Sequence, residues 1–443
     1  MTENSEIELL EKNKKSIAGG VVSINRATNP TKVFAKAKGA YLWDINGNKY
    51  IDYHAAFSPY FLGHNFEPVE NAVIDAIKSG QSLMGAGTTT WEGELAELVK
   101  ECVPNIEKLQ ITNTGSEATY FALRIARAHT QRDEIIIMQG GYNGWHNDVC
   151  YNLMDPADSM QDYTPGNEHS LRPFSAGMPK CQNDLVHAVE YNDIEAITKL
   201  LNTKNIAAII LEPILQNIGI VKPQNDFLQK LRSACDSTGT LLIFDEVKTG
   251  FRHALGGYQS IAKVKPDLST FGKAIANGYP LGIIGGKEKY MSYFHHEDSS
   301  KKVLIAGTYN AHPIPVAAAI ATLKFLKANE KEVYEKVESL GALIEEKLNQ
   351  LFLSFDHHAN TARQGSAFVT YFMDHLPTCW TDIAKNHNFD LDTKYRQLLI
   401  EENIFQFPTP TKQGSISFAH TEEDILETIS KTDTVLQKLK DKI

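Results

Sequence analysis

Two acids stand side by side at the end of an apolar run, and their types and placement suit chemistry. Residues 241–250 read LLIFDEVKTG, so Asp245 and Glu246 follow a run typical of a buried strand. An acid in that place is often only a turn former or a helix cap. A carboxylate enclosed in a pocket can instead keep a pyridine nitrogen protonated, because an opposite charge favours the charged form. Val247 lies two residues beyond Asp245, on the same side of an extended chain, where it could pack flat against such a ring.

A second stretch supplies groups that suit an anion. TNTGSEATYFALRIARA, residues 112–128, places Gly115 and Ser116 at the start of an expected helix. The first N–H groups of a helix have no partner within it, and a glycine and a hydroxyl beside them complete a site for a phosphate. The plainer interpretation, a Thr-Gly-Ser helix cap and nothing more, stays open on these residues alone.

A third stretch places a lysine where lysines are seldom found. STFGKAIANGYPLG, residues 269–282, puts Lys273 among small residues in a turn rich in glycine. Lysines are normally solvated, whereas a desolvated amine becomes a nucleophile that can form a Schiff base. A phosphate cup, an acid for a ring nitrogen and a Schiff-base lysine are together what pyridoxal phosphate requires. The three stretches therefore predict a site for pyridoxal 5'-phosphate.

The elements that must position these residues follow an α/β pattern. Apolar runs at 134–140, 206–213, 241–247 and 281–287 are typical of buried parallel strands, and helical stretches lie between them. This alternation predicts a doubly wound, mostly parallel sheet. Ligands of such sheets bind outside the carboxyl ends of the strands, which is where the three stretches would meet.

The two ends of the chain differ from this centre. Residues 38–53, KGAYLWDINGNKYIDY, predict a hairpin with an Asn-Gly turn. A long helical pattern leads into a C-terminal α+β region. We therefore expect a large cofactor-binding domain over residues 61–312 and a small α+β domain built from both chain ends, residues 1–60 and 313–443.

Composition excludes several classes of partner. A net charge of -10 without a block rich in Lys and Arg argues against nucleic acid. No apolar run approaches the roughly 18 residues of a membrane span, and the opening MTENSEIELLEKNKK is polar rather than signal-like, so a cytoplasmic protein without membrane partners is expected. The five cysteines lie far apart without metal-ligand spacing, so neither a metal site nor a disulfide framework is expected.

A series of motifs extends these stretches along the chain. In order they are GGVVSINR, GAYLWDINGNKYIDY, TNTGSEA, GGYNGWH, LEPILQN, FDEVKTGFR, FGKAIANGYPLG, AGTYNAHP and SFAHTEED. Nearly end to end, the chain resembles the class III, fold-type I enzymes that use pyridoxal phosphate, and most closely the glutamate-1-semialdehyde aminomutase group. The resemblance implies the fold-type I architecture and a homodimer with shared active sites.

The resemblance also implies roles for individual residues. Lys273 would form the Schiff base, and Asp245 would pair with the pyridinium. The other implied cofactor residues are Tyr142 and Val247 at the ring faces, Gly115 and Ser116 at the phosphate, Asn217 at the phenolic oxygen, and Thr308 at the phosphate of the neighbouring subunit.

The implied substrate residues are Ser23, Arg26 and Phe57, and the arginine offers a carboxylate a bidentate fork. The chain departs from the aminomutase pattern at Phe57, where that group has a tryptophan, and at Lys412, where it has an acid that meets a diamine intermediate. The group's mobile gating loop is replaced by the unlike residues 151–180. A segment of that length is usually disordered or an active-site lid, and both interpretations stay open.

This chain lacks both the acid and the gating loop with which the aminomutase group retains its diamine intermediate. Their absence favours an aminotransferase over an aminomutase. An amino acid would give its amino group to the cofactor, and a keto acid would accept it, by ping-pong transamination. The favoured donor is a β-amino acid. The alternative is a glutamate-1-semialdehyde 2,1-aminomutase, or a related epimerase, which needs no keto acceptor. The identities of donor and acceptor, and the stereochemistry, stay open.

Overall fold

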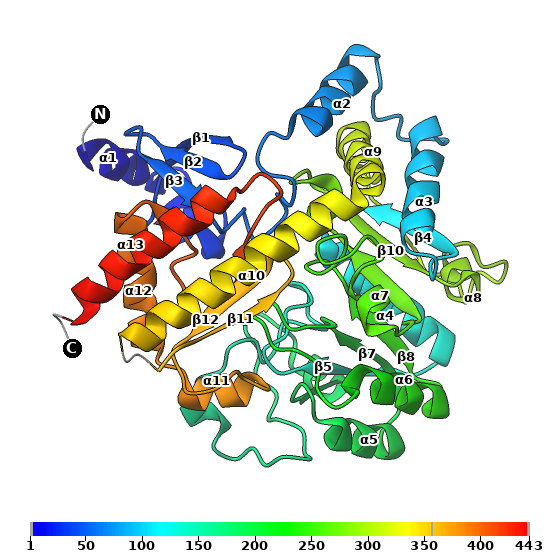
Figure 1. Ribbon diagram of the computed structural model, residues 1–443. Helices are drawn as coiled ribbons and strands as arrows, with labels where there is room; N and C mark the ends of the chain where they lie inside the picture. Colours follow the sequence, from blue (N-terminus) through cyan, green and yellow to red (C-terminus); the bar gives the residue numbers. More distant parts are fainter. Residues whose placement is uncertain (1–2, 356–357, 441–443) are drawn as a thin grey trace. The chain divides into compact units, whose positions relative to one another are not determined.

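A computed structural model describes residues 3–355 and 358–440 of the chain (Figure 1). The chain divides into two compact units. The larger unit comprises Glu67–Glu335 and Pro377–His387, and the smaller unit comprises Met1–Phe66, Lys336–Leu376 and Asn388–Ile443. Both arms of the chain that flank the central region thus contribute to the smaller unit.

The larger unit is built on a sheet whose described strands have the order β4-β10-β9-β8-β7-β5-β6. The strands are β4 (Lys108–Thr112), β5 (Glu134–Met138), β6 (Val186–Val189), β7 (Ile206–Leu211), β8 (Leu241–Asp245), β9 (Leu268–Phe271) and β10 (Gly282–Gly286). Every residue of β7 and β8 is buried, which is why their sequences are unbroken apolar runs up to the last residue of β8. The sheet is mixed and mostly parallel, as the sequence predicts.

One strand of this sheet corrects the sequence analysis. The run at 281–287 predicts a parallel strand, and that is wrong, because β10 is antiparallel to both β4 and β9. Residues 272–281 alone connect β9 to β10, which is too short for a parallel crossover of about a dozen residues or more. The chain therefore turns back on itself, and this turn contains Lys273.

Helices cover both faces of the sheet. α4 (Gly115–Thr130) covers one face, and α5 (Ile194–Thr203) and α6 (Phe227–Thr238) cover the other (Figure 1). Ala118, Ala122 and Ile125 of α4 are fully buried in the main core together with residues of the strands. The other helices placed in this unit are α2 (Glu67–Lys78), α3 (Thr90–Cys102), α7 (Tyr258–Ala262), α8 (Glu288–Met291), α9 (Pro313–Ala328) and α11 (Trp380–Asn386).

The described part of the smaller unit has sheets of order β1-β2-β3-β13 and β11-β12-β14. Their strands are β1 (Phe34–Lys38), β2 (Tyr41–Asp44), β3 (Lys49–Asp52), β11 (Asn360–Gln364), β12 (Ala367–Tyr371), β13 (Ile404–Phe405) and β14 (Gly414–Ser415). The predicted Asn-Gly hairpin is confirmed, since β2 pairs with β3 and Gly47 has a φ of 88°.

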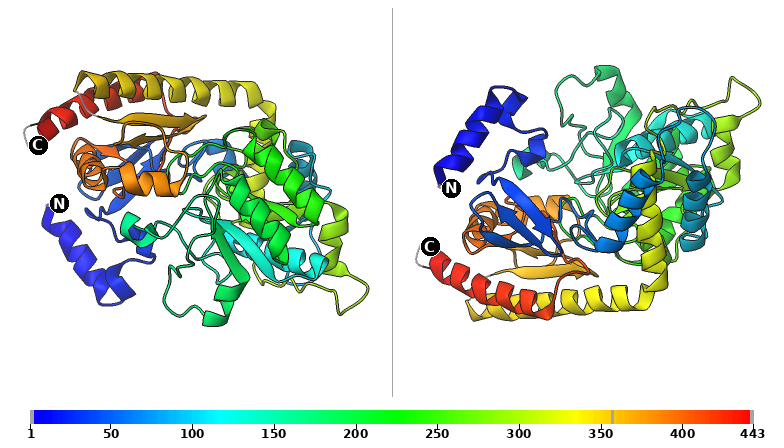
Figure 2. Two further views of the ribbon diagram at one scale, coloured as in Figure 1. Left: turned by 90° about the horizontal axis from the view of Figure 1, so that it is seen from below. Right: turned by 90° about the horizontal axis from the view of Figure 1, so that it is seen from above.

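Three helices of the smaller unit contribute to a second core, α12 (Phe389–Glu401), α13 (Glu422–Lys440) and most of α10 (Glu330–Ser354). The N-terminal helix α1 (Glu3–Lys14) belongs to the same unit. α10 and α13 lie on the same side of the sheet that contains β11 and β12 (Figure 2). Ile344 of α10, Leu399 of α12 and Val435 of α13 are fully buried in this core.

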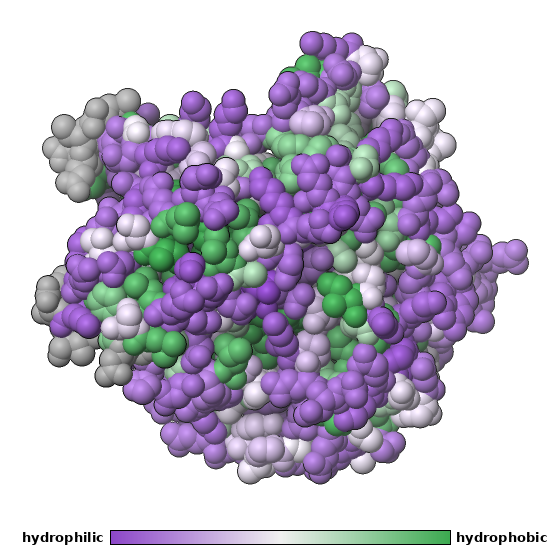
Figure 3. All heavy atoms as spheres, viewed as in Figure 1, coloured by the Kyte–Doolittle hydropathy of each residue, from purple (hydrophilic) through white to green (hydrophobic). Residues whose placement is uncertain are grey.

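The face of the molecule seen in Figure 3 is mostly hydrophilic, with separate small apolar areas. Within the described residues, no helix is long and apolar enough to cross a membrane. The same residues contain no group of three or more His, Cys, Asp or Glu side chains placed to hold a metal ion.

Candidate active site

A cavity of about 190 Å³ lies at the carboxyl ends of the central strands of the larger unit. β8 ends at Asp245, and Glu212 follows directly after β7. The cavity is lined by Gly115, Ser116, Tyr142, Asn143, Gly144, Glu212, Asn217, Asp245, Val247, Lys248 and Lys273. The fold therefore brings every expected cofactor residue except Thr308 into one cavity.

Asp245 is almost fully buried, with 3% of its surface exposed. Its Oδ1 accepts hydrogen bonds from the backbone N–H of Val247 at 3.0 Å and from the hydroxyl of Thr270 at 3.1 Å. Its Oδ2 accepts one from Nδ2 of Asn143 at 2.9 Å. Burial raises the pKa of Asp245, and these donors and the charge of Lys273 oppose that rise. Because a carboxylate offers about four lone-pair positions, Oδ2 retains room for one more donor.

Lys273 opens a short 3₁₀ turn, η5 (Lys273–Ala276), which Gly272 alone separates from the end of β9. Its backbone φ of 50° is uncommon for a residue with a side chain, and such strain concentrates at functional sites. Burial lowers the pKa of its amine, while the charges of Asp245 and Glu212 raise it. An amine whose pKa is lowered gives up its proton more readily and is the better nucleophile.

The start of α4 touches the cavity at Gly115. A Cβ on this residue would lie 2.7 Å from Cγ2 of Val247, which is closer than real contacts allow, so glycine alone fits. The hydroxyl of Thr114 accepts from the N–H of Glu117 at 3.2 Å, and the Glu117 carboxylate accepts from the N–H of Thr114 at 3.2 Å. This capping box makes the stretch a true helix cap. Gly115 and Ser116 also line the cavity, so the same turn offers its first amides to an anion.

The model of one protein family, aminotransferase class-III, matches residues 23–385. The chain belongs to the class-III aminotransferase family. This class-III enzyme is 37% identical over 430 residues to a glutamate-1-semialdehyde 2,1-aminomutase of Francisella philomiragia subsp. philomiragia, a match that covers 95% of each chain. The resemblance carried by the motifs is thereby confirmed. This relative bears the name of the aminomutase, the alternative expected from the sequence, and not of a keto-acid aminotransferase.

Solved structures share the fold of this class-III enzyme. An omega-transaminase from Sphaerobacter thermophilus matches with a TM-score of 0.89 and 25% identity, covering 98% of this chain and 97% of that one. A beta-phenylalanine aminotransferase from Variovorax paradoxus matches with a TM-score of 0.84 and 26% identity, covering 99% of this chain and 95% of that one. The expected fold-type I architecture is confirmed.

The cavity contains residues that sequence reasoning did not place there, among them Glu212, Asn143 and Lys248. Glu212 is buried, and it accepts a hydrogen bond from the backbone N–H of Tyr142 at 3.1 Å. Burial raises the pKa of Glu212, and the charge of Lys248 opposes the rise. The signal for Glu212 was present in the sequence, because it follows a buried strand just as Asp245 ends one.

Glu246, the neighbour of Asp245, has a structural role in this class-III enzyme. It is fully buried, and its carboxylate accepts from the backbone N–H groups of Tyr258 at 2.7 Å and Gln259 at 2.9 Å. These amides open α7, so Glu246 satisfies the free donors of a helix start. The two acids at the end of β8 thus divide their tasks, and Asp245 alone lines the cavity.

The other expected site residues lie outside this cavity. Thr308 is exposed and lines a different cavity of the larger unit, of about 540 Å³. Arg26 and Phe57 line a cavity within the smaller unit, and Ser23 directly precedes the short helix η2 (Ile24–Arg26). The roles of these residues toward a substrate and a second subunit stay predictions.

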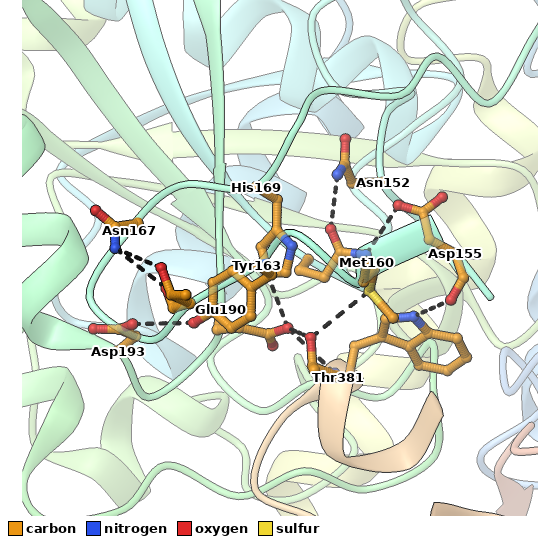
Figure 4. A network of polar contacts seen from close by, with 12 residues as sticks. Asn152, Asp155, Met160, Tyr163, Asn167, His169, Glu190, Asp193 and Thr381 are labelled. Carbon is orange, nitrogen blue, oxygen red and sulfur yellow. Dashed lines mark hydrogen bonds and ion pairs between the residues drawn. The ribbon is translucent and has the colours of Figure 1, made fainter. Parts of the chain in front are cut away.

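Buried side chains hold residues 151–180 to other segments of the larger unit (Figure 4). Nε2 of His169 lies 3.0 Å from Oε1 of Glu190, which also accepts from the backbone N–H and the hydroxyl of Thr381. The ring of Tyr163 stacks on His169 with centroids 3.9 Å apart. These contacts favour an ordered segment over a disordered one, and its role as a lid stays a prediction.

Proposed function

We propose that this class-III enzyme binds pyridoxal 5'-phosphate in the cavity of its larger unit and uses it to take an amino group from an amino acid. The observation that carries the proposal is the pairing of buried Asp245 with Lys273, an amine of lowered pKa, in one cavity. When bound, the cofactor supplies an electron sink for the negative charge left when a proton leaves the substrate carbon.

The lining residues fit the parts of this cofactor. The first amides of α4, at Gly115 and Ser116, suit its phosphate. Val247 is half-buried, and Tyr142 is 37% exposed. Both side chains offer apolar faces to a flat ring. The side-chain amide of Asn217 offers a donor for the phenolic oxygen.

Asp245 and Lys273 divide the proton chemistry between them. The remaining position on Oδ2 of Asp245 would accept a hydrogen bond from the protonated ring nitrogen, and the negative charge of the carboxylate would keep the proton on that nitrogen. The amine of Lys273 would hold the cofactor and, when free, would act as the base that takes the proton from the substrate carbon. The pKa of Lys273, lowered by burial, suits this second task.

We further propose that the keto product escapes and that a keto acid then accepts the amino group. Two features support this outcome, Lys412 in place of the acid that steadies a diamine and the anchoring of residues 151–180 by buried contacts. The aminomutase reaction, which needs no keto acceptor, is the second candidate because the relative at 37% identity carries that name.

Arg26 supports a donor that carries a carboxylate. Among the residues that the structure describes, no carboxylate forms an ion pair with its guanidinium. We propose that Ser23 and Phe57 contact the same substrate. The name of the Variovorax paradoxus structure supports a β-amino acid as the donor.

The proposal is tested by a screen of amino donors with and without pyruvate or 2-oxoglutarate, following the absorbance of the cofactor and the keto product. We expect turnover only with an acceptor, and poor use of glutamate-1-semialdehyde. Lys412→Glu should improve use of that substrate about tenfold, because a charge-assisted contact with an amine is restored. Efficient conversion of glutamate-1-semialdehyde to 5-aminolevulinate by the unaltered enzyme without an acceptor would replace the aminotransferase with the second candidate.

A further inference from the structure

Asn143 lies in the loop after β5 and lines the same cavity as Asp245. It is buried, and its Nδ2 donates to Oδ2 of Asp245 at 2.9 Å. An ionised carboxylate can only accept hydrogen bonds, so this contact also decides which end of the amide faces Asp245. Burial raises the pKa of Asp245, and the hydrogen bond from Asn143 opposes that rise more than the other contacts of the carboxylate do.

The backbone of Asn143 is fastened to α4. Thr119, a buried residue of that helix, places its hydroxyl 2.6 Å from the carbonyl oxygen of Asn143 and 3.1 Å from that of Ser116. A hydroxyl has one proton to donate, so its lone pairs remain free to accept from Nε2 of His146, 3.1 Å away. Burial lowers the pKa of His146 to about 4, so at neutral pH its ring is neutral and has one N–H to give.

The residues on either side of Asn143 are held in place as well. The N–H of Tyr142 donates to Oε1 of Glu212 at 3.1 Å. Gly144 has a φ of 128°, and a Cβ there would lie 3.1 Å from Oγ of Ser116, so the position favours glycine. The loop therefore fixes the direction in which the Asn143 side chain leaves the backbone.

We propose that Asn143 is a positioning residue for the cofactor, which joins the acid for the ring nitrogen to the helix start that suits the phosphate. Its side-chain amide occupies one position on Oδ2 of Asp245 and leaves the other to the ring nitrogen. This inference rests on the proposed function. A neutral donor suits the task, because a cation in its place would compete with the protonated ring for the charge of Asp245.

The test compares two cofactors that differ only at the ring nitrogen. They are pyridoxal 5'-phosphate and its deaza analogue, in which a C–H replaces that nitrogen, and each is titrated into the full-length, cofactor-free enzyme. The unaltered enzyme should prefer pyridoxal 5'-phosphate by at least about tenfold, because only this cofactor forms a charge-assisted hydrogen bond with Asp245. The phosphate and the aldehyde are common to both, so their contributions cancel in this nitrogen preference.

Variants at position 143 should lower the nitrogen preference. Asn143→Ala, and Asn143→Leu, which keeps a similar size without a donor, should each lower it about tenfold. The chemical shift of the ring nitrogen, measured with ¹⁵N-labelled cofactor, should move towards that of a neutral pyridine in both variants. A merely structural defect would weaken both cofactors alike and leave the preference and the chemical shift unchanged.

The matched control removes another buried amide of the larger unit. Nδ2 of Asn152 donates to Oε1 of Gln139 at 2.8 Å, and Asn152 lies outside the cofactor cavity. Asn152→Ala should therefore keep the full nitrogen preference. Full preference in both Asn143 variants, with their circular dichroism intact, would overturn the proposal.

Thr119→Val tests the backbone contact separately. Valine has nearly the shape of threonine but no hydroxyl, so Asn143 keeps its amide and loses its fastening to α4. We expect the nitrogen preference to fall about threefold, less than in the Asn143 variants. An unchanged preference in Thr119→Val would overturn the part of the proposal that concerns the backbone.

Failure of this inference is distinguishable from failure of the proposed function. Borohydride should fix the cofactor onto Lys273 whatever residue stands at position 143. If the unaltered enzyme shows the nitrogen preference and the Asn143 variants keep it, Asp245 retains its proposed role and only Asn143 is misassigned. If the unaltered enzyme binds both cofactors equally, the role of Asp245 in the proposed function fails.

Discussion

The two cavities of this enzyme are built by different means. The cavity of the larger unit carries two acids and two lysines, Asp245, Glu212, Lys248 and Lys273, at the ends of strands buried along their whole length. The cavity of the smaller unit carries one arginine without an ion-pair partner among the described residues, and the left-handed run at residues 55–58 supplies Ala56 and Phe57 of its lining.

The proposed function assigns chemistry to the cavity of the larger unit and substrate recognition to the cavity of the smaller unit. Charges that must move a proton need fixed positions, which rigid strand ends provide, whereas groups that select a side chain can stand on loops. Changes in the larger unit's cavity should therefore affect every substrate alike, mainly through kcat. Changes in the smaller unit's cavity should affect KM and depend on the substrate.

The largest effect should come from Lys273→Ala. Loss of the amine removes both the attachment of the cofactor and the base, and the base alone is worth roughly 10²–10⁴ in rate. We expect kcat to fall below detection for every donor and the borohydride adduct to disappear from the peptide map. The control is Lys230→Ala, which removes an exposed lysine of the same unit. A cofactor trapped on another lysine would contradict the assignment.

Asp245→Asn should follow, with kcat reduced more than about a hundredfold for all donors. A neutral amide cannot keep the ring nitrogen protonated, and breaking a buried ion pair costs about 3–5 kcal/mol. The absorbance of the bound cofactor should change at the same time, which a purely structural defect would not cause. Activity within a few-fold of the unaltered enzyme would remove Asp245 from the chemistry.

Mixing two inactive variants tests whether Thr308 serves a partner subunit. Lys273→Ala protomers combined with Thr308→Asp protomers should recover up to about a quarter of full activity, because half of the dimers pair one good lysine with one good threonine. Native mass spectrometry would confirm that the subunits exchange. No recovery despite exchange would mean that each chain completes its own site.

Arg26→Ala tests the role of the smaller unit's cavity. We expect KM to rise about 10- to 100-fold for donors with a carboxylate, because a hydrogen bond to a charged group is worth about 1.5–3 kcal/mol. Simple amines should keep their KM, and kcat should change little. A uniform loss for amines and amino acids alike would move Arg26 from recognition to structure.

The smallest predicted effect is that of Lys273→Met on the thermal stability of the cofactor-free protein. Burial lowers the pKa of Lys273 in the folded protein below its ordinary 10.5, so its charge destabilises the fold most below that lowered pKa. The cost fades as pH rises through the lowered pKa towards 10.5. Lys273→Met should therefore raise the Tm of the cofactor-free protein by about 1–2 °C at neutral pH, and the gain should shrink at alkaline pH. Lys230→Met is the control, and a gain that grows with pH would have the wrong sign.

The sequence predicts the residues of the larger unit's cavity better than those of the smaller unit's cavity, for a physical reason. Asp245 and Gly115 sit where an apolar run stops or a helix starts, and such local patterns fix their place at the sheet edge. The direction of β10 was missed because an apolar run records burial and not orientation.

Local sequence patterns do not predict the cavity of the smaller unit. Phe57 was expected at the substrate only by resemblance, and its contact with Phe407 joins segments separated by most of the chain. Residues 55–58 have left-handed backbone angles, but none of them is a glycine that would have indicated this conformation in the sequence. Contacts of this kind follow from tertiary packing, which overrides local preference.

The network around residues 151–180 has a consequence for how the chain is made. Glu190 and His169 lie early in the sequence, whereas Thr381, which completes their contacts, arrives only with α11 near the end. At a synthesis rate of 5–20 residues per second, the intervening stretch of about 190 residues takes roughly 10–40 s to emerge. During that interval the carboxylate of Glu190 lacks these donors, so a nascent chain remains open here to proteases and chaperones until translation is nearly finished.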